Sequence, residues 1–294
     1  DGNITNGTSG DGGAIEFYTG STSTINSTIF KNNKAGSSEN SDSGRNGGAT
    51  KGNGSCTIAF NNCIFYDNVA QYYSGAHVNW MNDGGSSTFD NCTFEGNRTY
   101  WSGGALGAYY GNITIKNSVI YNNLNGNGSA GYDMYDSGGG KITATNVIHR
   151  SSVSVTFSGT NLTSDPLFTD ASSNDYTLQS TSPAIGAGNT DATATDFNGI
   201  TRPQGTNDDI GAYEYRNTWT GGSNTTDWGT TGNWDQGYEP NANTESPIIA
   251  NVTKQPVISS DDGASDDGNV LLEDITINSG AELTINADAA LTLE

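Results

Sequence analysis

The stretch Asn62-Cys63-Ile64-Phe65-Tyr66-Asp67-Asn68 carries the pattern that decides the fold of this 294-residue chain. It begins and ends with asparagine, has a small residue in second place and has an apolar residue in fourth place. Similar stretches begin at Asn26, Asn91 and Asn117, and a degenerate copy begins at Asn146. The starts lie 36, 29, 26 and 29 residues apart. Repeating units of this length predict a solenoid in which each repeat stacks on the next.

The residues around each leading asparagine alternate as they do in β-strands. Apolar residues lie four and two places before it, as Ile58 and Phe60 do before Asn62, and the next inward residue lies three places after it. The alternation therefore changes phase at the asparagine, which tolerates the left-handed backbone conformation of a corner. Because stacked strands lie about 4.8 Å apart, equivalent side chains should stack in two columns. We expect a ladder of hydrogen-bonded amides at Asn26, Asn62, Asn91, Asn117 and Asn146, and an apolar column at Ile29, Phe65, Phe94 and Ile120.

A second pattern, a tripeptide of two small residues and alanine, recurs once in each of the first four repeats. The tripeptides are Gly12-Gly13-Ala14, Gly47-Gly48-Ala49, Ser74-Gly75-Ala76 and Gly103-Gly104-Ala105. Two of the three cysteines, Cys63 and Cys92, fall at one repeat position. Parallel stacking holds Cβ atoms farther apart than a disulfide requires, so we expect two buried thiols there.

These repeats resemble the parallel β-helix repeats of secreted bacterial proteins. The pairing of Gly-Gly-Ala with Phe-x-x-Asn is similar to repeats of the polymorphic membrane protein type. The corner asparagines resemble the asparagine ladder of pectate-lyase-like proteins. The resemblance implies an all-β fold in which residues 1–163 form a right-handed parallel β-helix, followed by a smaller β-rich module.

Residues 164–215 change character. The stretches Asp165-Pro166-Leu167-Phe168 and Asp209-Ile210-Gly211-Ala212-Tyr213-Glu214 are similar to choice-of-anchor segments that follow β-helix repeats in bacterial surface proteins. We expect this segment to cap the last repeat, because an open array exposes unpaired strand edges. Arg202 is expected to form a structural ion pair with Asp209 or Glu214.

Residues 216–294 contain Trp219, Trp228 and Trp234 followed by short alternating strands. These tryptophan motifs resemble a module of large Bacteroidota surface proteins. The resemblance implies the start of a further surface domain, an extracellular or cell-surface location in a bacterium, and export by type IX secretion. We expect the chain to be part of a longer polypeptide.

The charge of the chain excludes several partners. It carries 32 acidic and 11 basic residues, a formal net charge of −21. Such a charge repels nucleic acids and anionic membrane surfaces. No apolar run approaches the length of a membrane-spanning helix, so we expect neither a nucleic-acid partner nor a direct membrane span.

Several tyrosines and tryptophans of the repeats lie outside the predicted inward positions. If they form an exposed stripe along the solenoid, their ring faces could stack on sugars, and the partners would be extracellular glycans or other surface proteins. Long inserts could instead cover the rings, which would make them local packing. The candidates are Tyr18, Tyr72, Tyr73, Trp80, Tyr100, Trp101, Tyr109 and Tyr110.

Carboxylates suggest a second kind of site. Oxygen-rich clusters can bind Ca²⁺, the only cofactor that the sequence suggests, and here the candidates are Asp196, Asp208 and Asp209. The competing interpretation is a solvated acidic surface.

The sequence favours a structural or adhesive segment of a larger surface protein over an enzyme. The alternative is a polysaccharide-active enzyme, either a Ca²⁺-dependent lyase or a glycoside hydrolase using carboxylates such as Asp67 and Glu95. The basic residues that a lyase would need occupy unrelated repeat positions: Lys51, His77, Arg98, Lys116 and Arg150. No catalytic residue is therefore assigned.

Threonines suggest a third kind of surface. Threonine pairs such as Thr22 and Thr24 suggest ice binding, but we expect no flat threonine array that persists from repeat to repeat. Ice binding is therefore not predicted.

Overall fold

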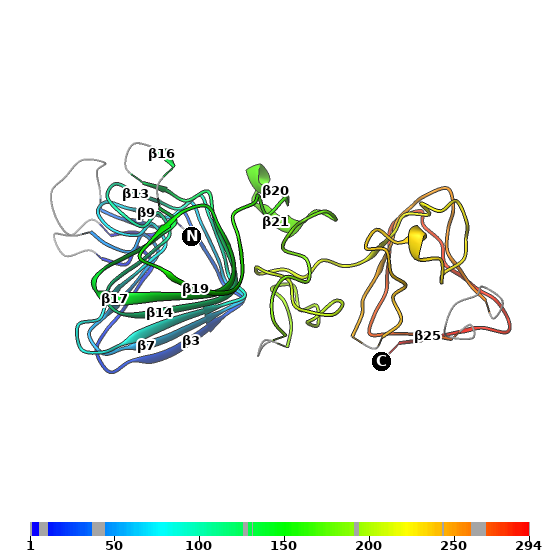
Figure 1. The fold of residues 1–294 in the computed structure, drawn as a ribbon, viewed down its shortest axis with the longest axis horizontal. Helices are drawn as coiled ribbons and strands as arrows, with labels where there is room; N and C mark the ends of the chain where they lie inside the picture. The colour runs from blue at the N-terminus through cyan, green and yellow to red at the C-terminus, as the bar shows by residue number, and fades with distance from the viewer. Residues whose placement is uncertain are drawn as a thin grey trace.

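The computed structural model describes residues 2–5, 11–36, 45–125, 129–130, 132–190, 194–242, 244–259 and 269–293. The protein is all-β, and its largest element is a parallel sheet that curls into a half-barrel (Figure 1). The predicted all-β, solenoid-like class is therefore confirmed.

Each repeat adds one strand to each of three parallel ladders in this sheet, and every strand pairs with its equivalent in the next repeat. The first ladder contains β2 (Ile15–Phe17), β6 (Thr50–Asn53), β10 (His77–Trp80) and β18 (Ser152–Val153). The second contains β3 (Thr22–Asn26), β7 (Thr57–Asn61) and β11 (Ser86–Asp90). The third contains β4 (Ile29–Lys31), β8 (Ile64–Tyr66) and β12 (Thr93–Glu95). The long strands β14 (Leu106–Tyr121) and β17 (Met134–His149) run through all three ladders, and β19 (Thr156–Leu162) continues the second and third.

A smaller sheet completes each repeat. Its strands are β1 (Ile4–Thr5), β5 (Lys34–Ala35), β9 (Val69–Ala70), β13 (Arg98–Thr99), β15 (Leu124–Asn125) and β16 (Ser129–Ala130). These strands pair in parallel except for β15 with β16.

The interior of the half-barrel is a column of stacked side chains. Phe60 and Phe89 stack with ring centroids 4.8 Å apart, and Phe65 stacks on Phe94 at the same 4.8 Å. This is the spacing of neighbouring strands, so residues in register meet face to face. Alternation along each strand selects which residues enter this core.

The glycine tripeptides form the tightest corner. Their first residues all have positive φ, including the non-glycine Ser74 at 58°. A Cβ on Gly48 would lie 2.0 Å from the carbonyl oxygen of Gly75 in the next repeat. The second position therefore requires glycine because two layers of backbone touch there.

The first repeat is displaced by one residue from the predicted alignment. The left-handed corner residue is Ser27 (φ 42°), whereas Asn62, the corner residue of the next repeat, has φ 51°. Strand pairing places Asn26 beside Asn61 and Phe30 beside Phe65. The apolar column therefore begins at Phe30, and the prediction of Ile29 is wrong: Ile29 is 43% exposed.

An asparagine ladder exists, but not at the predicted corner. The buried amides of Asn33, Asn68 and Asn97 each donate to the next asparagine at 2.9 Å, and Asn123 donates to Asp133 at 3.1 Å. These are the asparagines one position after the second corner of each repeat. The predicted ladder at Asn26, Asn62, Asn91, Asn117 and Asn146 has only one such amide contact among the described residues, from Asn146 to Asn117 at 3.2 Å.

Three of the five predicted ladder residues bind another part of the chain instead. Asn62 donates to the carbonyl of Thr195 at 2.6 Å, and Asn117 donates to that of Asn189 at 2.9 Å. The amide of Asn91 lies against the guanidinium of Arg202. Side chains at a left-handed corner point outward, so they are available to hold residues 184–215 against the sheet.

Residues 164–215 therefore lie along the side of the half-barrel. They begin with an antiparallel hairpin of β20 (Phe168–Asp170), η1 (Ala171–Ser173) and β21 (Asp175–Leu178). Their apolar residues pack with Ile64, Val119 and Ile148 on the outer face of the third ladder. This differs from the predicted cap over the last repeat, because the third ladder has apolar residues on both faces.

The expected ion pair of Arg202 is formed with Glu214. The two side chains are 1% and 0% exposed, and Arg202 also donates to the carbonyl of Gly211 at 2.9 Å.

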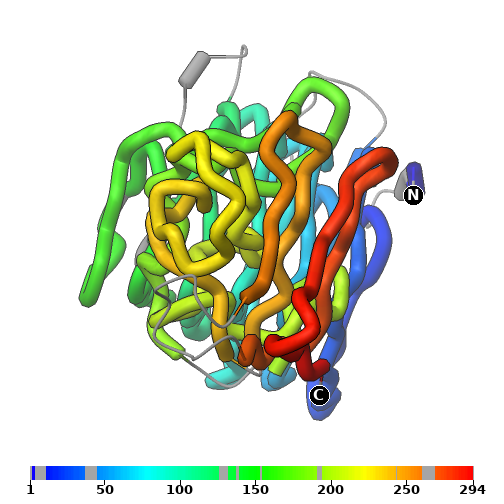
Figure 2. The backbone as a smooth tube through the Cα atoms, turned by 90° about the vertical axis from the view of Figure 1, so that its right-hand side faces the viewer, coloured from blue at the N-terminus to red at the C-terminus, as the bar shows by residue number. Residues whose placement is uncertain are grey.

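Residues 217–293 form a second set of parallel pairings (Figures 1 and 2). One sheet contains β22 (Thr218–Trp219), β23 (Ile248–Ile249) and β26 (Thr276–Ile277). The others pair β24 (Val257–Ile258) with β27 (Thr284–Ile285), and β25 (Asn269–Leu272) with β28 (Ala290–Leu293). The turn η2 (Thr231–Asn233) precedes Trp234, which packs with Trp219 and Trp228 in a separate core.

Candidate functional site

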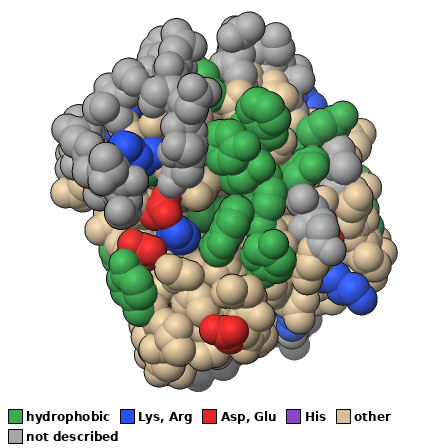
Figure 3. All heavy atoms as spheres, turned by 90° about the vertical axis from the view of Figure 1, so that its left-hand side faces the viewer, with side chains coloured by type: hydrophobic (Ala, Val, Ile, Leu, Met, Phe, Trp, Pro, Cys, Tyr) green, Lys and Arg blue, Asp and Glu red, His purple; other side chains and the backbone are tan. Residues whose placement is uncertain are grey.

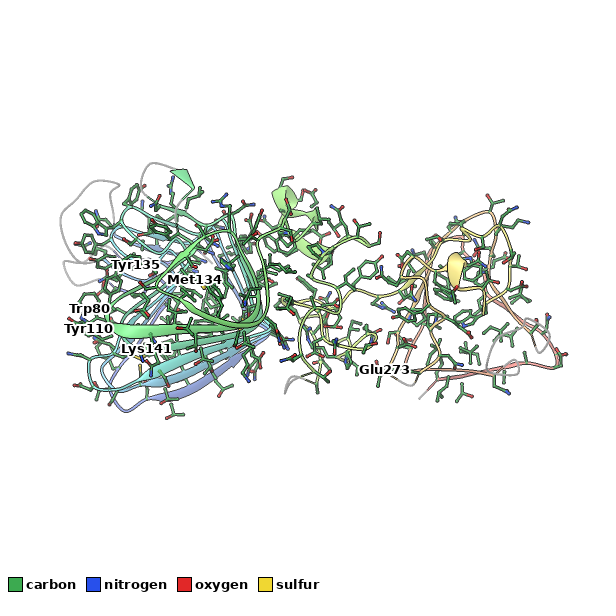
Figure 4. The ribbon with its side chains drawn as sticks, viewed as in Figure 1. Trp80, Tyr110, Met134, Tyr135, Lys141 and Glu273 are labelled. Carbon is green, nitrogen blue, oxygen red and sulfur yellow. The ribbon has the colours of Figure 1, made fainter. Side chains whose placement is uncertain are left out.

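The candidate site is an aromatic surface beside the first ladder. Ring contacts join six of the eight predicted residues and add a seventh, Tyr135. Figure 3 shows apolar side chains gathered on this face, and Figure 4 shows Trp80, Tyr110 and Tyr135 on the same side of the half-barrel. The joined residues that were predicted are Tyr72, Tyr73, Trp80, Trp101, Tyr109 and Tyr110.

Strand register brings these rings together from two adjacent repeats. A bridge between Tyr73 and Ser102 puts Tyr72 next to Trp101, and their centroids are 5.4 Å apart. Trp80 pairs with Tyr110, after an irregularity that leaves Tyr109 as an extra residue in β14. Such a bulge lets neighbouring residues of one strand join the same surface.

The inner rings of this cluster pack on each other. The ring centroid of Tyr109 lies 3.9 Å from that of Tyr73 and 5.4 Å from that of Trp80, and Tyr109 is only 8% exposed. Tyr135 lies 6.0 Å from Tyr109, and Tyr72 lies 4.1 Å from Tyr73. These five rings therefore form an aromatic support, as the local-packing interpretation of the sequence expects.

Two rings of the same cluster face solvent. Trp101 is 60% exposed and Tyr110 is 43% exposed. Both belong to one repeat, and they are attached to different members of the aromatic support, Trp101 to Tyr72 and Tyr110 to Trp80. The aromatic surface thus offers two fixed contact rings, to which we refer as the contact pair.

Two predicted residues stand outside the ring cluster. Tyr18 is 62% exposed, and its hydroxyl donates to Glu16 at 3.0 Å. The ring of Tyr100 lies under the guanidinium of Arg98, 5.5 Å from its carbon. Tyr135 was missed because its repeat lacks the Gly-Gly-Ala tripeptide from which the other positions were counted; it pairs with Gly107.

Charges lie at the margin of the aromatic surface (Figure 3). Lys51 forms an ion pair with Asp11 and approaches Glu16 to 3.5 Å. Burial raises the pKa of Tyr73 to about 12 and also raises the pKa of Tyr109, so both phenols are neutral at physiological pH. The surface is therefore apolar and uncharged at its centre.

Two of the three predicted calcium ligands accept hydrogen bonds from backbone amides. Asp196 accepts from the backbone amides of Asn198 and Ile200 at 2.7 and 2.9 Å, and Asp209 accepts from that of Gly186 at 2.7 Å. Such contacts hold a loop and occupy the oxygens that a cation would need. In the part of the chain that the structure describes, no group of three or more His, Cys, Asp or Glu residues is placed to hold a metal ion. The prediction of a site at Asp196, Asp208 and Asp209 is therefore not supported by their geometry, although all three are buried.

His77 is removed from solvent. Its ring contacts Thr50 at 2.8 Å, Asn79 at 2.7 Å and Ser87 at 3.0 Å, and desolvation lowers its pKa to about 4. A fully buried histidine in the core cannot reach a polysaccharide, so its role is to satisfy neighbouring polar groups.

Asp67 and Glu95 are close to each other at the second corner of adjacent repeats. The backbone amide of Asp67 donates to the carbonyl of Glu95 at 3.3 Å. Partial desolvation raises the pKa of the Asp67 carboxyl, although this residue is exposed, and the burial of Glu95 raises its pKa to about 7. Glu95 also accepts from Asn122 at 3.0 Å. The two carboxyls therefore have the raised pKa that general acid catalysis uses.

A cavity of about 380 Å³ lies where residues 164–215 meet the C-terminal part. Its lining includes Tyr213, Tyr215 and Arg216. Arg216 donates to Thr276 at 2.9 Å, and the hydroxyl of Tyr215 contacts Asp235, so these polar groups hold the two parts together.

All three cysteines are free and buried.

Comparison with known proteins finds no family model, no curated protein and no solved structure that matches this chain. Among the described residues, no helix has the length and apolar character needed to cross a membrane.

Proposed function

We propose that this chain is an extracellular, adhesive segment of a larger bacterial surface protein, and that its aromatic surface binds glycans. The observation that carries the proposal is the contact pair, Trp101 and Tyr110, exposed by 60% and 43% and attached to the aromatic support. Rings held in this way lose little conformational freedom on binding.

The scaffold suits this role. We infer that the half-barrel is a right-handed parallel β-helix, which the parallel ladders and the stacked amides of Asn33, Asn68, Asn97 and Asn123 support. A stack of hydrogen-bonded repeats is stiff, and its length grows with the number of repeats. Such a rod would project binding surfaces from a cell, as the resemblance to Bacteroidota surface proteins implies.

The chemistry of the contact pair favours sugars over charged ligands. Ring faces pack against the C–H faces of pyranose rings, while the Tyr110 hydroxyl and the Trp101 indole N–H can donate to sugar oxygens. The net charge of −21 opposes binding of polyanions such as polyuronates. Neutral glycans are therefore the expected ligands.

A glycan array tests this proposal. The protein is applied with and without Ca²⁺, beside the Trp101→Ala/Tyr110→Ala double variant and a matched control, Tyr18→Ala, which removes an exposed tyrosine outside the ring cluster. We expect binding of the wild type and of Tyr18→Ala, and loss of binding in the double variant. Absence of any bound glycan in the wild type, with or without Ca²⁺, would refute the proposal.

A polysaccharide-active enzyme is the second candidate, favoured by the raised pKa of the neighbouring Asp67 and Glu95 carboxyls. Its test is turnover of neutral and uronic polysaccharides by the wild type and by Glu95→Gln. Release of new chain ends by the wild type, abolished in Glu95→Gln, would replace the adhesive proposal with this one.

A further inference from the structure

The outward face of the second ladder carries a regular rank of threonines. Strand pairing aligns one position from each repeat, and five of its six residues are threonine. The central rank is Thr24, Ala59, Thr88, Thr114, Thr143 and Thr156. The sequence analysis missed this rank, although Thr88, Thr114 and Thr143 each lie three places before a leading asparagine. Strand pairing adds Thr24 and Thr156 to it.

A second rank lies two residues earlier on the same face. It is Thr22, Thr57, Ser86, Asn112 and Lys141, so its first three positions carry hydroxyls. Between the two ranks the alternate residues turn inward, where Ile58, Ser87, Ile113 and Ile142 are buried. The hydroxyl face is therefore backed by a packed core over several repeats.

The spacing of these hydroxyls is set by the sheet. Positions two apart on a strand lie about 6.6–6.8 Å from each other, and equivalent positions on paired strands lie about 4.8 Å apart. The strands β3, β7, β14 and β17 run side by side along one side of the half-barrel (Figure 1). Both distances are close to oxygen repeat distances on the surfaces of ice.

The central rank has the composition that an ordered water lattice requires. It carries no charge, and Thr24, Thr88, Thr143 and Thr156 are exposed, while Ala59 and Thr114 are half-buried. A threonine side chain is stiff about χ1 and presents a methyl group beside a hydroxyl that can donate and accept. The hydrogen bonds it makes within the protein are long: 3.5 Å from Thr143 to Thr114, and 3.5 Å from Thr88 to the carbonyl of Ile58.

From this register we propose that the second-ladder face binds the surface of ice. Its threonine methyls order water between hydroxyls whose spacing is close to that of the ice lattice. This ordered water then becomes part of the growing crystal. The third rank on this face carries Asn61, Asp90 and Lys116, and its mixed charges exclude it from the proposed surface. These three residues line a hollow of about 190 Å³ together with Thr88 and Thr114 of the central rank. The binding surface is therefore the central rank and the hydroxyl half of the second rank.

Ice-affinity partitioning tests this inference. The fluorescently labelled protein is mixed with slowly growing ice, and the fraction retained in the crystal is measured. We expect the wild type to be retained and the Thr88→Tyr/Thr114→Tyr variant to be excluded, because two large rings replace neighbouring threonines of the central rank. Thr181→Tyr, at an exposed threonine in residues 164–215, is the matched control and should be retained like the wild type.

A gain-of-function variant guards against misfolding as an explanation. Ala59→Thr completes the central rank, so it should inhibit ice recrystallisation at a lower protein concentration than the wild type. Exclusion of the wild type from ice, or equal retention of the double tyrosine variant, would overturn the inference. So would retention on crystalline polysaccharide that depends on Thr88 and Thr114 without retention in ice. The Trp101→Ala/Tyr110→Ala variant should remain ice-bound, which separates this surface from the proposed glycan site.

Discussion

Asn97 donates its side-chain amide to Oδ1 of Asn123 at 2.9 Å, and the same contact recurs one repeat earlier between Asn68 and Asn97. The oxygen of each amide also accepts the backbone N–H of the preceding asparagine, at 3.2 Å for Asn68 and Asn97. The oxygen of Asn97 thus accepts both the side-chain amide and the backbone N–H of Asn68. This chain of contacts ties successive repeats together on the inside of the second corner.

Asn97→Ala should be strongly destabilising. It removes the acceptor for Asn68 and the donor to the carbonyl of Phe65, leaving buried polar groups without partners. Each such group costs about 1–3 kcal/mol of unfolding free energy. Denaturant unfolding followed by tyrosine and tryptophan fluorescence measures the effect.

Asn82→Ala is the matched control, since Asn82 is an exposed asparagine in the loop after β10. Its unfolding free energy should change by less than about 0.5 kcal/mol. If the two alanine variants were equally stable, the ladder would not have the structural importance assigned to it.

Asp133→Asn should flatten the dependence of stability on pH between about 4 and 6. Burial raises the pKa of Asp133 to about 6, above the value of about 3.9 expected in the unfolded chain. In that interval the folded protein keeps a proton that the unfolded chain has lost, so this group makes stability fall as pH rises. The amide introduced by the substitution cannot titrate but retains an oxygen that can accept from Asn123.

The check is the unfolding free energy of the wild type and of Asp133→Asn, measured at several pH values. From pH 4 to pH 6 the wild type should lose more stability than the variant. A constant difference between the two proteins across this range would show that Asp133 has the same pKa in the folded and unfolded states.

The sequence predicted the fold class and the register of the later repeats, but it did not predict the register of the first repeat. Alternating apolar residues and spaced asparagines predict strands and stacked repeats because each depends on local geometry. The first repeat has Ser27 where later repeats have asparagine, so matching Asn26 with Asn62 shifted that repeat by one residue. A shift of one residue exchanges the inner and outer faces of a strand. It put Ile29 in the core in place of Phe30 and Ser23, in place of Thr24, in the threonine rank.

The candidate sites depended on contacts that sequence spacing does not contain. Most of the aromatic surface was predicted, but which rings support and which face solvent depends on the bulge at Tyr109. The aspartates were interpreted as metal ligands because some of their partners, such as the backbone amide of Gly186 for Asp209 and that of Glu214 for Asp196, become neighbours only after folding.

Arg202→Met should loosen residues 184–215 from the half-barrel. Arg202 pairs with Glu214 and contacts the corner asparagines Asn62 and Asn91, all within a buried interface. Removing one member of a buried ion pair costs about 3–5 kcal/mol, because the remaining charge lies unpaired in a medium that solvates it poorly. Limited proteolysis should cut this segment faster in the variant, and denaturant unfolding should give the loss of stability.

The double variant Arg202→Met/Glu214→Leu distinguishes the cost of leaving one charge unpaired from the contribution of the ion pair itself. With both charges replaced by apolar groups of similar size, much of the lost stability should return. Equal proteolysis rates for the wild type and Arg202→Met would contradict the role given to this arginine.

Tyr109→Ala and Trp101→Ala should affect different properties. The first should lower the stability of the protein, and the second should weaken glycan binding with little change in stability. Tyr109 is 8% exposed and packs against Tyr73 with ring centroids 3.9 Å apart, so its removal leaves a cavity in the aromatic support and should cost about 3 kcal/mol of unfolding free energy. Trp101 is 60% exposed, so its removal should change the unfolding free energy by less than about 0.5 kcal/mol. Denaturant unfolding measures the first quantity, and the glycan array measures binding. Tyr18→Ala controls for the loss of an exposed ring. If Trp101→Ala destabilised the protein as much as Tyr109→Ala, Trp101 would belong to the support, and only Tyr110 would remain as a contact ring.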